Sequence, residues 1–206
     1  TPADWYYHEV LYAYENNLMQ GTSSTTFDPD TTTNRAMIVT VLYRLDNAPS
    51  VAAAGTFPDV AAGQYYTEAV EWSYSNKIVF GYDNGLFGPS DPLTREQMTA
   101  ILYRYAQYKG YDVSVGEDSD IHSYADISAI SEYALPALQW ACSKGLIKGT
   151  SDTTLSPASA ATRAQFATIL YRFCENVVAH ATEEHTVTFD YNYSDKGTYT
   201  TVSVRD

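Results

Sequence analysis

Arginine is the residue type whose positions in this chain point most directly to chemistry. Six of the seven arginines fall into two sets, and within each set the spacings are 60 and then 68 residues. The first set is Arg35, Arg95 and Arg163, and the second set is Arg44, Arg104 and Arg172. A guanidinium group presents a planar fork of N–H donors that matches a carboxylate. The position of each set within its helix decides whether it marks a candidate binding site for an acidic group or a structural role.

These arginines belong to an internal repeat of three copies. The copies align on three glycines, and each glycine is followed by an apolar residue six positions later, a proline eight positions later and an arginine fourteen positions later. The aligned glycines are Gly21, Gly81 and Gly149. Each copy also contains the tripeptide Leu-Tyr-Arg. A match this detailed across three segments indicates one structural unit repeated within the chain.

Each copy predicts a helix, a glycine-containing loop and a second helix. The second helix shows apolar residues at i, i+3, i+4 and i+7, which in the first copy are Ile38, Val41, Leu42 and Leu45. Side-chain oxygens that can cap the second helices stand at Asn34, Thr94 and Thr162. The first helices are expected over about 5–18, 65–78 and 132–146. We expect Gly81 and Gly149 to take a left-handed backbone where the first helices end, and their lack of a side chain would also let a ligand approach.

The first arginine set lies in the opening turn of the second helices. The helix dipole disfavours a cation there by about 0.3–1 kcal/mol, so the recurrence of arginine asks for a compensating interaction. The residues leave two alternatives open. The free amides of the helix start and the guanidinium fork together suit an acidic sugar. Otherwise each arginine pairs internally with an aspartate, Asp59 or Asp126. The second set lies late in the helices, where a cation suits the dipole, and we expect it to be mainly structural.

The overall composition excludes several classes of protein. The chain has 206 residues and a net charge of −13, and this acid excess argues against nucleic acid as a partner. With 45% hydrophobic and 14% aromatic residues, the chain is expected to fold. We expect no membrane insertion, because no apolar run approaches the roughly 20 residues of a span and no leader pattern is present. Since the chain starts at Thr1, we expect a mature or excised fragment.

The sequence predicts no enzyme, no cofactor and no metal site. Among 25 acidic residues no pair is marked by spacing as a glycosidase pair, and nucleophile-elbow, phosphate-loop and dinucleotide patterns are missing. The four histidines are isolated and lie outside the repeated positions. The acidic run at 117–120 is expected to be a solvated linker rather than a calcium site. Cys142 and Cys174 are expected to be buried thiols, although the geometry could allow a disulfide.

Four segments are expected along the chain. The three repeats occupy residues 1–50, 51–112 and 113–178, and a segment with a different pattern follows over 179–206. Residues with large apolar side chains alternate at the start of this last segment, namely Val187, Phe189, Tyr191 and Tyr193. Together with a turn expected at 195–197, this alternation predicts a β-hairpin.

The motifs of the second copy resemble those of the S-layer homology domain. They are Phe57-Pro58-Asp59-Val60, Leu93-Thr94-Arg95-Glu96-Gln97 and Ile101-Leu102-Tyr103-Arg104. The third copy carries the signature as Thr162-Arg163-Ala164-Gln165. The first copy keeps only Asn34 and Arg35 of it, and it lacks the Phe-Pro-Asp-Val motif because the chain starts just downstream. The resemblance covers about residues 1–176, and residues 186–206 are similar to the opening of a β-rich repeat of bacterial surface proteins.

This resemblance implies both a fold and a function. The implied fold is mainly α, with three helix-loop-helix repeats arranged as an intrachain pseudo-threefold trimer around a central bundle of first helices, plus the C-terminal β-hairpin. The implied function is non-catalytic anchoring at the bacterial cell surface by a monomeric chain. Grooves between the repeats would bind secondary cell-wall polysaccharide, an acidic and pyruvylated glycan linked to peptidoglycan, and so tether a surface protein. The alternative is a protein-interaction or self-assembly scaffold whose activity lies in other parts of the polypeptide.

The resemblance also implies which residues meet the glycan. The first arginine set is expected to contact the ligand, with Asp59 and Asp126 orienting the arginines. Trp72 and Trp140 are expected to border the groove, where an indole face can stack on a sugar, and Tyr12 stands at their position in the first copy. The remaining predicted lining residues are Gly81, Gly149 and Tyr82. Because the signature of the first copy is degraded, its site is expected to be the weakest.

Overall fold

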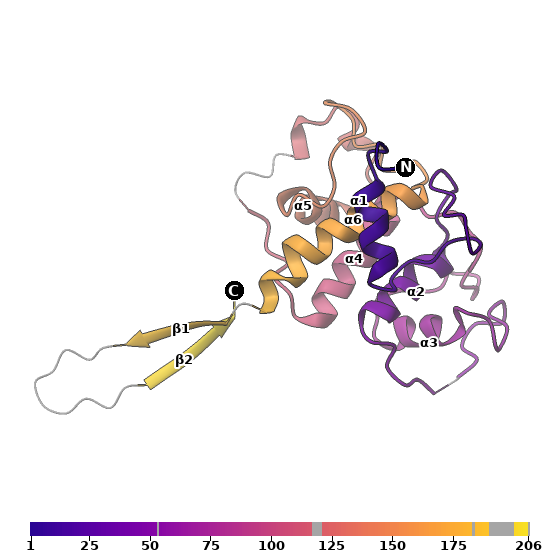
Figure 1. The fold of residues 1–206 in the computed structure, drawn as a ribbon, viewed down its shortest axis with the longest axis horizontal. Helices are drawn as coiled ribbons and strands as arrows, with labels where there is room; N and C mark the ends of the chain where they lie inside the picture. The colour runs from indigo at the N-terminus through magenta and orange to yellow at the C-terminus, as the bar shows by residue number, and fades with distance from the viewer. Residues whose placement is uncertain (53, 117–120, 183, 190–199, 206) are drawn as a thin grey trace, which may run out of the picture.

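The chain is mainly helical in the computed structural model, which describes residues 1–52, 54–116, 121–182, 184–189 and 200–205 (Figure 1). The α-helices are α1 (Tyr7–Glu15), α2 (Arg35–Leu45), α3 (Thr67–Ser75), α4 (Arg95–Lys109), α5 (Leu135–Ser143) and α6 (Arg163–Phe173). Short helical turns are η1 (Ile121–Ser123), η2 (Ile127–Ala129), η3 (Glu132–Ala134), the π-helical η4 (Cys174–Val178) and η5 (His180–Thr182). Three successive helix pairs match the three predicted repeats, so the mainly helical prediction is confirmed.

The second helix of each copy begins where its capping residue predicts. Asn34 caps α2 by accepting a hydrogen bond from the amide of Met37. Thr94 and Thr162 cap α4 and α6 through complete capping boxes, in which a glutamine three residues later accepts from the amide of the threonine. Each cap places the first-set arginine at the first residue of its helix. The caps therefore fix where these arginines stand.

The first helices end earlier than the apolar pattern suggests. Their last residues are followed by a left-handed residue at one repeat position, Asn17 (φ 57°), Lys77 (φ 59°) or Gly145 (φ 67°). The expectation that Gly81 and Gly149 take this conformation is wrong, because neither has a positive φ. A Cβ atom on Gly81 would instead stand 2.4 Å from the Phe57 ring, and one on Gly149 would stand 2.2 Å from a loop carbonyl oxygen. Close approach therefore requires glycine at these two positions.

Helices of different copies pack against one another. Helix α3 packs on α2 and α5 packs on α4, so a first helix lies on the second helix of the preceding copy. Helix α1 completes the series by packing on α6, and Figure 1 shows these two helices side by side. This arrangement differs from the expected central bundle of first helices. The physical reason is burial: α2 buries eight of its side chains, whereas α1 buries only that of Ala13.

A ring of backbone hydrogen bonds joins the three copies just ahead of their second helices. The amide of Thr33 donates to Ala161 (2.8 Å), that of Ala161 donates to Leu93 (3.0 Å), and that of Leu93 donates to Thr33 (2.9 Å). The three residues are equivalent in the repeat and are fully buried. The copies are thus bonded in a closed cycle just ahead of α2, α4 and α6.

The C-terminal strands lie outside this helical body (Figure 1). Strand β1 (Glu184–Phe189) pairs with β2 (Thr200–Arg205) in antiparallel register, with Glu184 opposite Arg205 and Phe189 opposite Thr200. The turn expected at 195–197 and the acidic run at 117–120 lie outside the described residues. The similarity of this segment to a β-rich surface repeat stays a prediction.

Two further expectations concern the thiols and the membrane. Cys142 and Cys174 are free thiols, half-buried and buried, and burial raises the pKa of each to about 11. The thiolate is therefore scarce at neutral pH, and both groups serve as packing side chains. Among the described residues, no helix has the length and apolar character needed to cross a membrane.

Candidate binding site in the grooves between repeats

Each arginine of the first set reaches across to the loop of the next copy. Arg35 donates from Nε to the carbonyl oxygen of Phe87 (2.8 Å) and from Nη2 to that of Phe80 (2.7 Å). The other two arginines make the equivalent bonds, from Arg95 to Leu155 (2.9 Å) and Lys148 (2.9 Å) and from Arg163 to Phe27 (2.8 Å) and Gln20 (2.6 Å). The guanidinium groups are buried and hold both sides of the loop. These arginines therefore lock neighbouring copies together.

The opening amides of the second helices are also occupied. The amide of Arg35 donates to the carbonyl oxygen of Asp91 (3.1 Å), and the amide of Ala36 donates to that of Pro89 (3.0 Å). The helices α4 and α6 have the same arrangement with the loops of the following copies. Carbonyl oxygens of the neighbouring loop thus meet the positive end of each helix. The idea that these amides stand free for an anion is corrected, because the cyclic packing of the copies satisfies them.

Asp59 and Asp126 accept hydrogen bonds from backbone amides of the same loops. Asp59 accepts from the amides of Phe87 (2.9 Å) and Gly88 (2.7 Å), and Asp126 makes the equivalent bonds to Leu155 (2.9 Å) and Ser156 (2.7 Å). Burial raises the pKa of Asp59, but the two amide bonds and the nearby Arg35 outweigh it and lower the pKa. Within the described residues neither aspartate forms an ion pair with an arginine. Each orients the loop peptide whose carbonyl oxygen the arginine binds.

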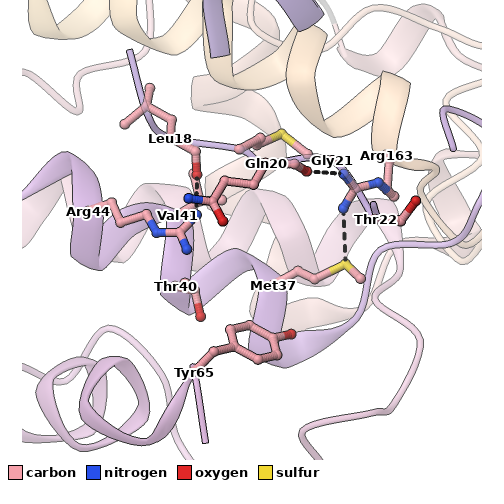
Figure 2. Close-up of a pocket in the computed structure, with 11 residues that line it drawn as sticks. Leu18, Gln20, Gly21, Thr22, Met37, Thr40, Val41, Arg44, Tyr65 and Arg163 are labelled. Carbon is pink, nitrogen blue, oxygen red and sulfur yellow. Dashed lines mark hydrogen bonds between the residues drawn. The ribbon is translucent and has the colours of Figure 1, made fainter. Parts of the chain in front are cut away.

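One groove, called groove A here, is built from all three copies and has a volume of about 310 Å³. Figure 2 shows its side chains, with Arg44 and Arg163 facing the groove from two sides and Tyr65 below them. Arg44 comes from α2, Tyr65 precedes α3, and Arg163 opens α6. Arg44 donates to the carbonyl oxygen of Leu18 at 3.1 Å. The remaining lining residues are Leu18, Met19, Gln20, Gly21, Thr22, Met37, Thr40 and Val41.

A second groove, groove B, repeats this plan one copy further along the chain. Its lining residues are Arg35, Val79, Phe80, Gln97, Ala100, Ile101, Arg104 and Tyr133, around about 230 Å³. In the repeat, Arg35 is equivalent to Arg163 of groove A and Arg104 is equivalent to Arg44. Tyr133 is equivalent to Tyr65. The Arg104 guanidinium lies 5.3 Å from the centre of the Phe80 ring. Both grooves therefore combine one arginine of each set with a tyrosine that is 62% (Tyr65) or 52% (Tyr133) exposed.

Groove B is lined by two cations, Arg35 and Arg104, and the nearby carboxylates of Asp91 and Asp59 favour the charged form of Arg35. Burial lowers the pKa of both Arg35 and Arg104, and the proximity of Arg35 lowers that of Arg104 further. Across the described part of the chain, the ion pairs involve Lys109, Lys144 and the N-terminus, and none involves an arginine of the two sets. Two guanidinium groups thus face one groove without a carboxylate bound to either. An acidic ligand would relieve this repulsion.

The aromatic residues of the groove differ from those expected. Trp72 and Trp140 are only 2% and 0% exposed, because the helix face that carries them packs into the core, so neither ring is open for stacking. Tyr12, at the same repeat position, packs against Tyr171 with 5.0 Å between ring centres. Tyr82 is 38% exposed, and the Arg35 guanidinium lies 4.6 Å from its ring centre. Of the predicted aromatic residues, Tyr82 therefore lies beside a groove arginine.

Sequence reasoning missed two features of the grooves. The second arginine set was expected to be mainly structural, yet Arg44 and Arg104 line grooves A and B. The tyrosines Tyr65 and Tyr133 were not predicted as binding residues. Their signal was present, because Trp5 stands at the same repeat position and all three of these aromatic residues are more than half exposed.

Comparison with known proteins bears on the whole repeat region. The S-layer homology domain matches residues 1–36, 56–99 and 123–167. The chain is similar to an amylopullulanase of Thermoanaerobacterium thermosulfurigenes, with 31% identity covering 81% of this chain and 9% of that protein. It is also similar to the surface-layer 125 kDa protein of Lysinibacillus sphaericus (31%, covering 79% and 13%) and to a cellulosome-anchoring protein of Acetivibrio thermocellus (35%, covering 47% and 21%). The chain thus spans between 9% and 21% of the length of these relatives.

Proposed function

The chain belongs to the S-layer homology family of cell-wall anchoring domains at the cell surface, and on that premise we propose that its grooves bind an acidic cell-wall polysaccharide. The proposed ligand carries a carboxylate, as a pyruvylated sugar does. The proposed unit is a monomer with pseudo-threefold symmetry. Because the relatives are several times longer than this chain, we further propose that it tethers a larger surface protein without itself catalysing a reaction.

The observation that carries the proposal is the pair of arginines in each groove. Arg35 uses Nε and one Nη2 hydrogen on carbonyl oxygens of the loop. A guanidinium group has five N–H donors, so donors remain for a ligand at this arginine. Arg104 adds a second cation from the opposite helix. A sugar carboxylate placed between the two would receive charge-assisted hydrogen bonds from groups that the fold already holds in position.

Aromatic side chains support a sugar as the carrier of this carboxylate. Tyr65 and Tyr133 are more than half exposed at the edges of grooves A and B, where a flat ring can stack on the apolar face of a pyranose. Both phenols lie close enough to the arginines for the arginine charges to lower their pKa, although burial raises it more. Each groove therefore offers a stacking surface beside a carboxylate-binding pair.

We propose a third groove of the same kind beside Trp5. Trp5 stands at the repeat position of Tyr65 and Tyr133, and it is 65% exposed. Arg95 and Arg172 bind carbonyl oxygens of one segment, at Lys148 (2.9 Å) and Leu146 (3.4 Å). These contacts match those of the arginines around groove A. We therefore include Trp5, Arg95 and Arg172 in the proposed set of binding residues.

Sedimentation with purified cell-wall sacculi tests the proposal. The informative variants are Arg104→Gln and Tyr133→Ala in groove B, because neither side chain makes the loop contacts of the first arginine set; Tyr133 has one long hydrogen bond, to Glu96 at 3.4 Å. Matched controls are Arg205→Gln, which removes the one arginine outside the two sets, and Tyr14→Ala, which removes an exposed tyrosine away from grooves A and B. We expect weaker binding for the groove variants and unchanged binding for the controls.

The polysaccharide itself is tested by removing it from the sacculi. Binding should be lost from sacculi whose polysaccharide has been chemically stripped, while peptidoglycan remains. Undiminished binding to stripped sacculi would refute the polysaccharide proposal, and it would favour a protein-interaction or self-assembly scaffold instead. Equal sedimentation of Arg104→Gln and Arg205→Gln would refute the role of the arginine pair.

A further inference from the structure

A buried carboxylate is hydrogen-bonded to the tyrosine of groove B. Glu96 is the second residue of α4, the helix that also carries Arg104, and it is only 7% exposed. Its carboxylate accepts from the amide of Ser131 (3.0 Å), from the hydroxyl of Ser131 (2.8 Å) and from the hydroxyl of Tyr133 (3.4 Å). Ser131 directly precedes η3, which contains Tyr133. Glu96 therefore fixes the segment that brings Tyr133 to the groove.

The repeat shows that this contact is particular to groove B. In the other two copies, alanine stands at the position of Glu96, and the position of Ser131 has no hydroxyl group. The equivalent pairs are Ala36 with Gly63, and Ala164 with Ala3. An alanine side chain cannot accept a hydrogen bond, so the equivalent of the Glu96 contact cannot form at the other two positions.

The contact changes what the tyrosine of the groove can offer a ligand. A phenol has one hydrogen to donate and lone pairs that accept, whereas a carboxylate only accepts. The hydrogen of the Tyr133 hydroxyl is therefore used on Glu96, and toward a ligand this hydroxyl is an acceptor. The hydroxyl of Tyr65, at the edge of groove A, makes no hydrogen bond within the described part of the chain (Figure 2). Tyr65 can therefore still donate.

The charge of Glu96 acts in the same direction. Burial and then Glu96 raise the pKa of Tyr133, while the two arginines of groove B lower it. Burial and the neighbouring Tyr66 raise the pKa of Tyr65, while the two arginines of groove A lower it. Each phenol thus lies within range of the carboxylate that its arginine pair would bind. Only at Tyr133 does a carboxylate of the protein act on the phenol as well.

Loop carboxylates do not account for this difference. They lie near the first-set arginine of both grooves, where Asp28 favours the charged form of Arg163 and Asp91 and Asp59 favour that of Arg35. Glu96 is instead placed at the tyrosine, on the side of the groove that the ligand has to share with the phenol. The carboxylate that distinguishes the two phenols is therefore that of Glu96.

We propose that Glu96 is a positioning residue that lowers the affinity of groove B for a sugar carboxylate below that of groove A, and that makes Tyr133 an acceptor for a sugar hydroxyl. In groove A, Tyr65 donates to the carboxylate together with the arginine pair. In groove B, the carboxylate binds the arginine pair alone and meets the like charge of Glu96 nearby. This inference rests on the proposed function of the grooves.

The arginine side chains can report on each groove separately. The chain has seven arginines, so the Nε–H groups give few signals in an NMR spectrum, and those of Arg44 and Arg104 follow grooves A and B. The probes are a pyruvylated monosaccharide and its methyl ester, which has nearly the same size but no charge. We expect the acid to bind groove A at least about threefold more tightly than groove B, because a hydrogen bond to a charged group is gained only in groove A.

Glu96→Gln is the variant that isolates the charge. Glutamine keeps an acceptor for the Ser131 amide, and its NH₂ group donates to the Tyr133 hydroxyl, which frees the phenol hydrogen for the ligand. We expect the acid to bind groove B at least about threefold more tightly in this variant, with a smaller gain for the ester and no change at groove A. The matched control is Glu71→Gln, since Glu71 is 2% exposed, binds the amide (2.9 Å) and hydroxyl (2.6 Å) of Thr56, and lines neither groove. It should change neither affinity.

A second pair of variants tests the phenols while leaving Glu96 in place. Tyr65→Phe removes a hydroxyl that donates to the acid, whereas Tyr133→Phe removes one that is bound to Glu96. Tyr65→Phe should therefore weaken binding of the acid at groove A by a larger factor than Tyr133→Phe weakens it at groove B. Equal factors would overturn the inference.

The outcomes separate this inference from the proposed function. Equal affinities of the two grooves for the acid in the parent chain, or no gain at groove B in Glu96→Gln, would overturn the inference and leave the proposed function standing. A gain of the same size for acid and ester would also overturn it, because removal of a like charge cannot act on a neutral ligand. Unchanged Arg44 and Arg104 signals on addition of the acid to the parent chain would refute the proposed function, and the inference with it.

Discussion

The substitution Asp59→Asn should destabilise the fold by weakening the loop that carries the Arg35 contact. The Asp59 carboxylate accepts from the amides of Phe87 (2.9 Å) and Gly88 (2.7 Å). A hydrogen bond to a charged group contributes about 1.5–3 kcal/mol. Asparagine keeps one acceptor oxygen and places an NH₂ group against the other amide, so about 2–3 kcal/mol of the free energy of unfolding should be lost. For a chain of this size the corresponding drop in Tm is about 4–12 °C.

The assay is urea denaturation followed by circular dichroism, with Asp83→Asn as the matched control. Asp83 is exposed in the same copy and makes no hydrogen bond among the described residues. Because Phe87 donates to Asp59 and accepts from Arg35, the effects of Asp59→Asn and Arg35→Lys should also be non-additive in a double-mutant cycle. The reasoning is refuted when Asp59→Asn lowers the free energy of unfolding no more than Asp83→Asn does.

Three further predictions concern acid, the ring of copies and the aligned glycines. The folded state lowers the pKa of Asp59 and Asp126. Their contribution to the stability of the fold is therefore complete above the unfolded pKa of about 4, and it is lost as the pH falls through their folded pKa values. Below pH 4, Tm should fall less steeply in a variant with asparagine at both positions than in the parent chain. Thr33→Val should raise the free energy of unfolding by about 1 kcal/mol, because the fully buried Thr33 hydroxyl has no hydrogen-bond partner among the described residues, and a lower Tm would contradict this. Gly149→Ala should lower the free energy of unfolding, measured by urea denaturation, by more than about 2 kcal/mol, because the added Cβ would stand 2.2 Å from a carbonyl oxygen. Gly116→Ala is the control and should leave the free energy of unfolding nearly unchanged, because no atom lies within 4 Å of the added Cβ. Equal losses in the two variants would contradict the prediction.

The elements that sequence reasoning found are those whose signals are local. The N-caps Asn34, Thr94 and Thr162 bond to amides three residues away, and the second helices follow from a periodic apolar face. Both signals are complete within about one helix turn or two. The predicted starts of the second helices are confirmed because the capping residue and its amide partner lie within one helix turn of each other.

The partners of Arg35 could not be read in this way. Its acceptors are the backbone carbonyl oxygens of Phe80 and Phe87, and a carbonyl group belongs to every residue type, so it leaves no trace in a sequence. The repeat showed that Arg35, Arg95 and Arg163 are equivalent, but not that each faces the following copy. That information resides in the packing of α1 on α6, α3 on α2 and α5 on α4.

The assignment of aromatic residues failed for a related reason. An apolar helix face predicts burial, and Trp72 and Trp140 follow that rule at 2% and 0% exposure. The aromatic residues of grooves A and B, Tyr65 and Tyr133, were expected inside the first helices, but α3 begins at Thr67 and α5 at Leu135, so the helical periodicity used for the prediction does not apply to their orientation. The unused signal was the repetition of an aromatic residue at one position of the repeat, Trp5, Tyr65 and Tyr133.

The first arginine set links the cycle of copies to the proposed ligand site. Arg163 holds the first copy through the carbonyl oxygens of Phe27 and Gln20, and the same guanidinium lines groove A. Groove A exists only while α6 stays docked on the first copy, because its two arginines come from different copies. A ligand that bridges Arg44 and Arg163 would therefore bind the closed cycle and not an opened one. Binding should then stabilise the fold by linkage, and a rise in Tm with added acidic glycan that is lost in Arg44→Gln would measure it.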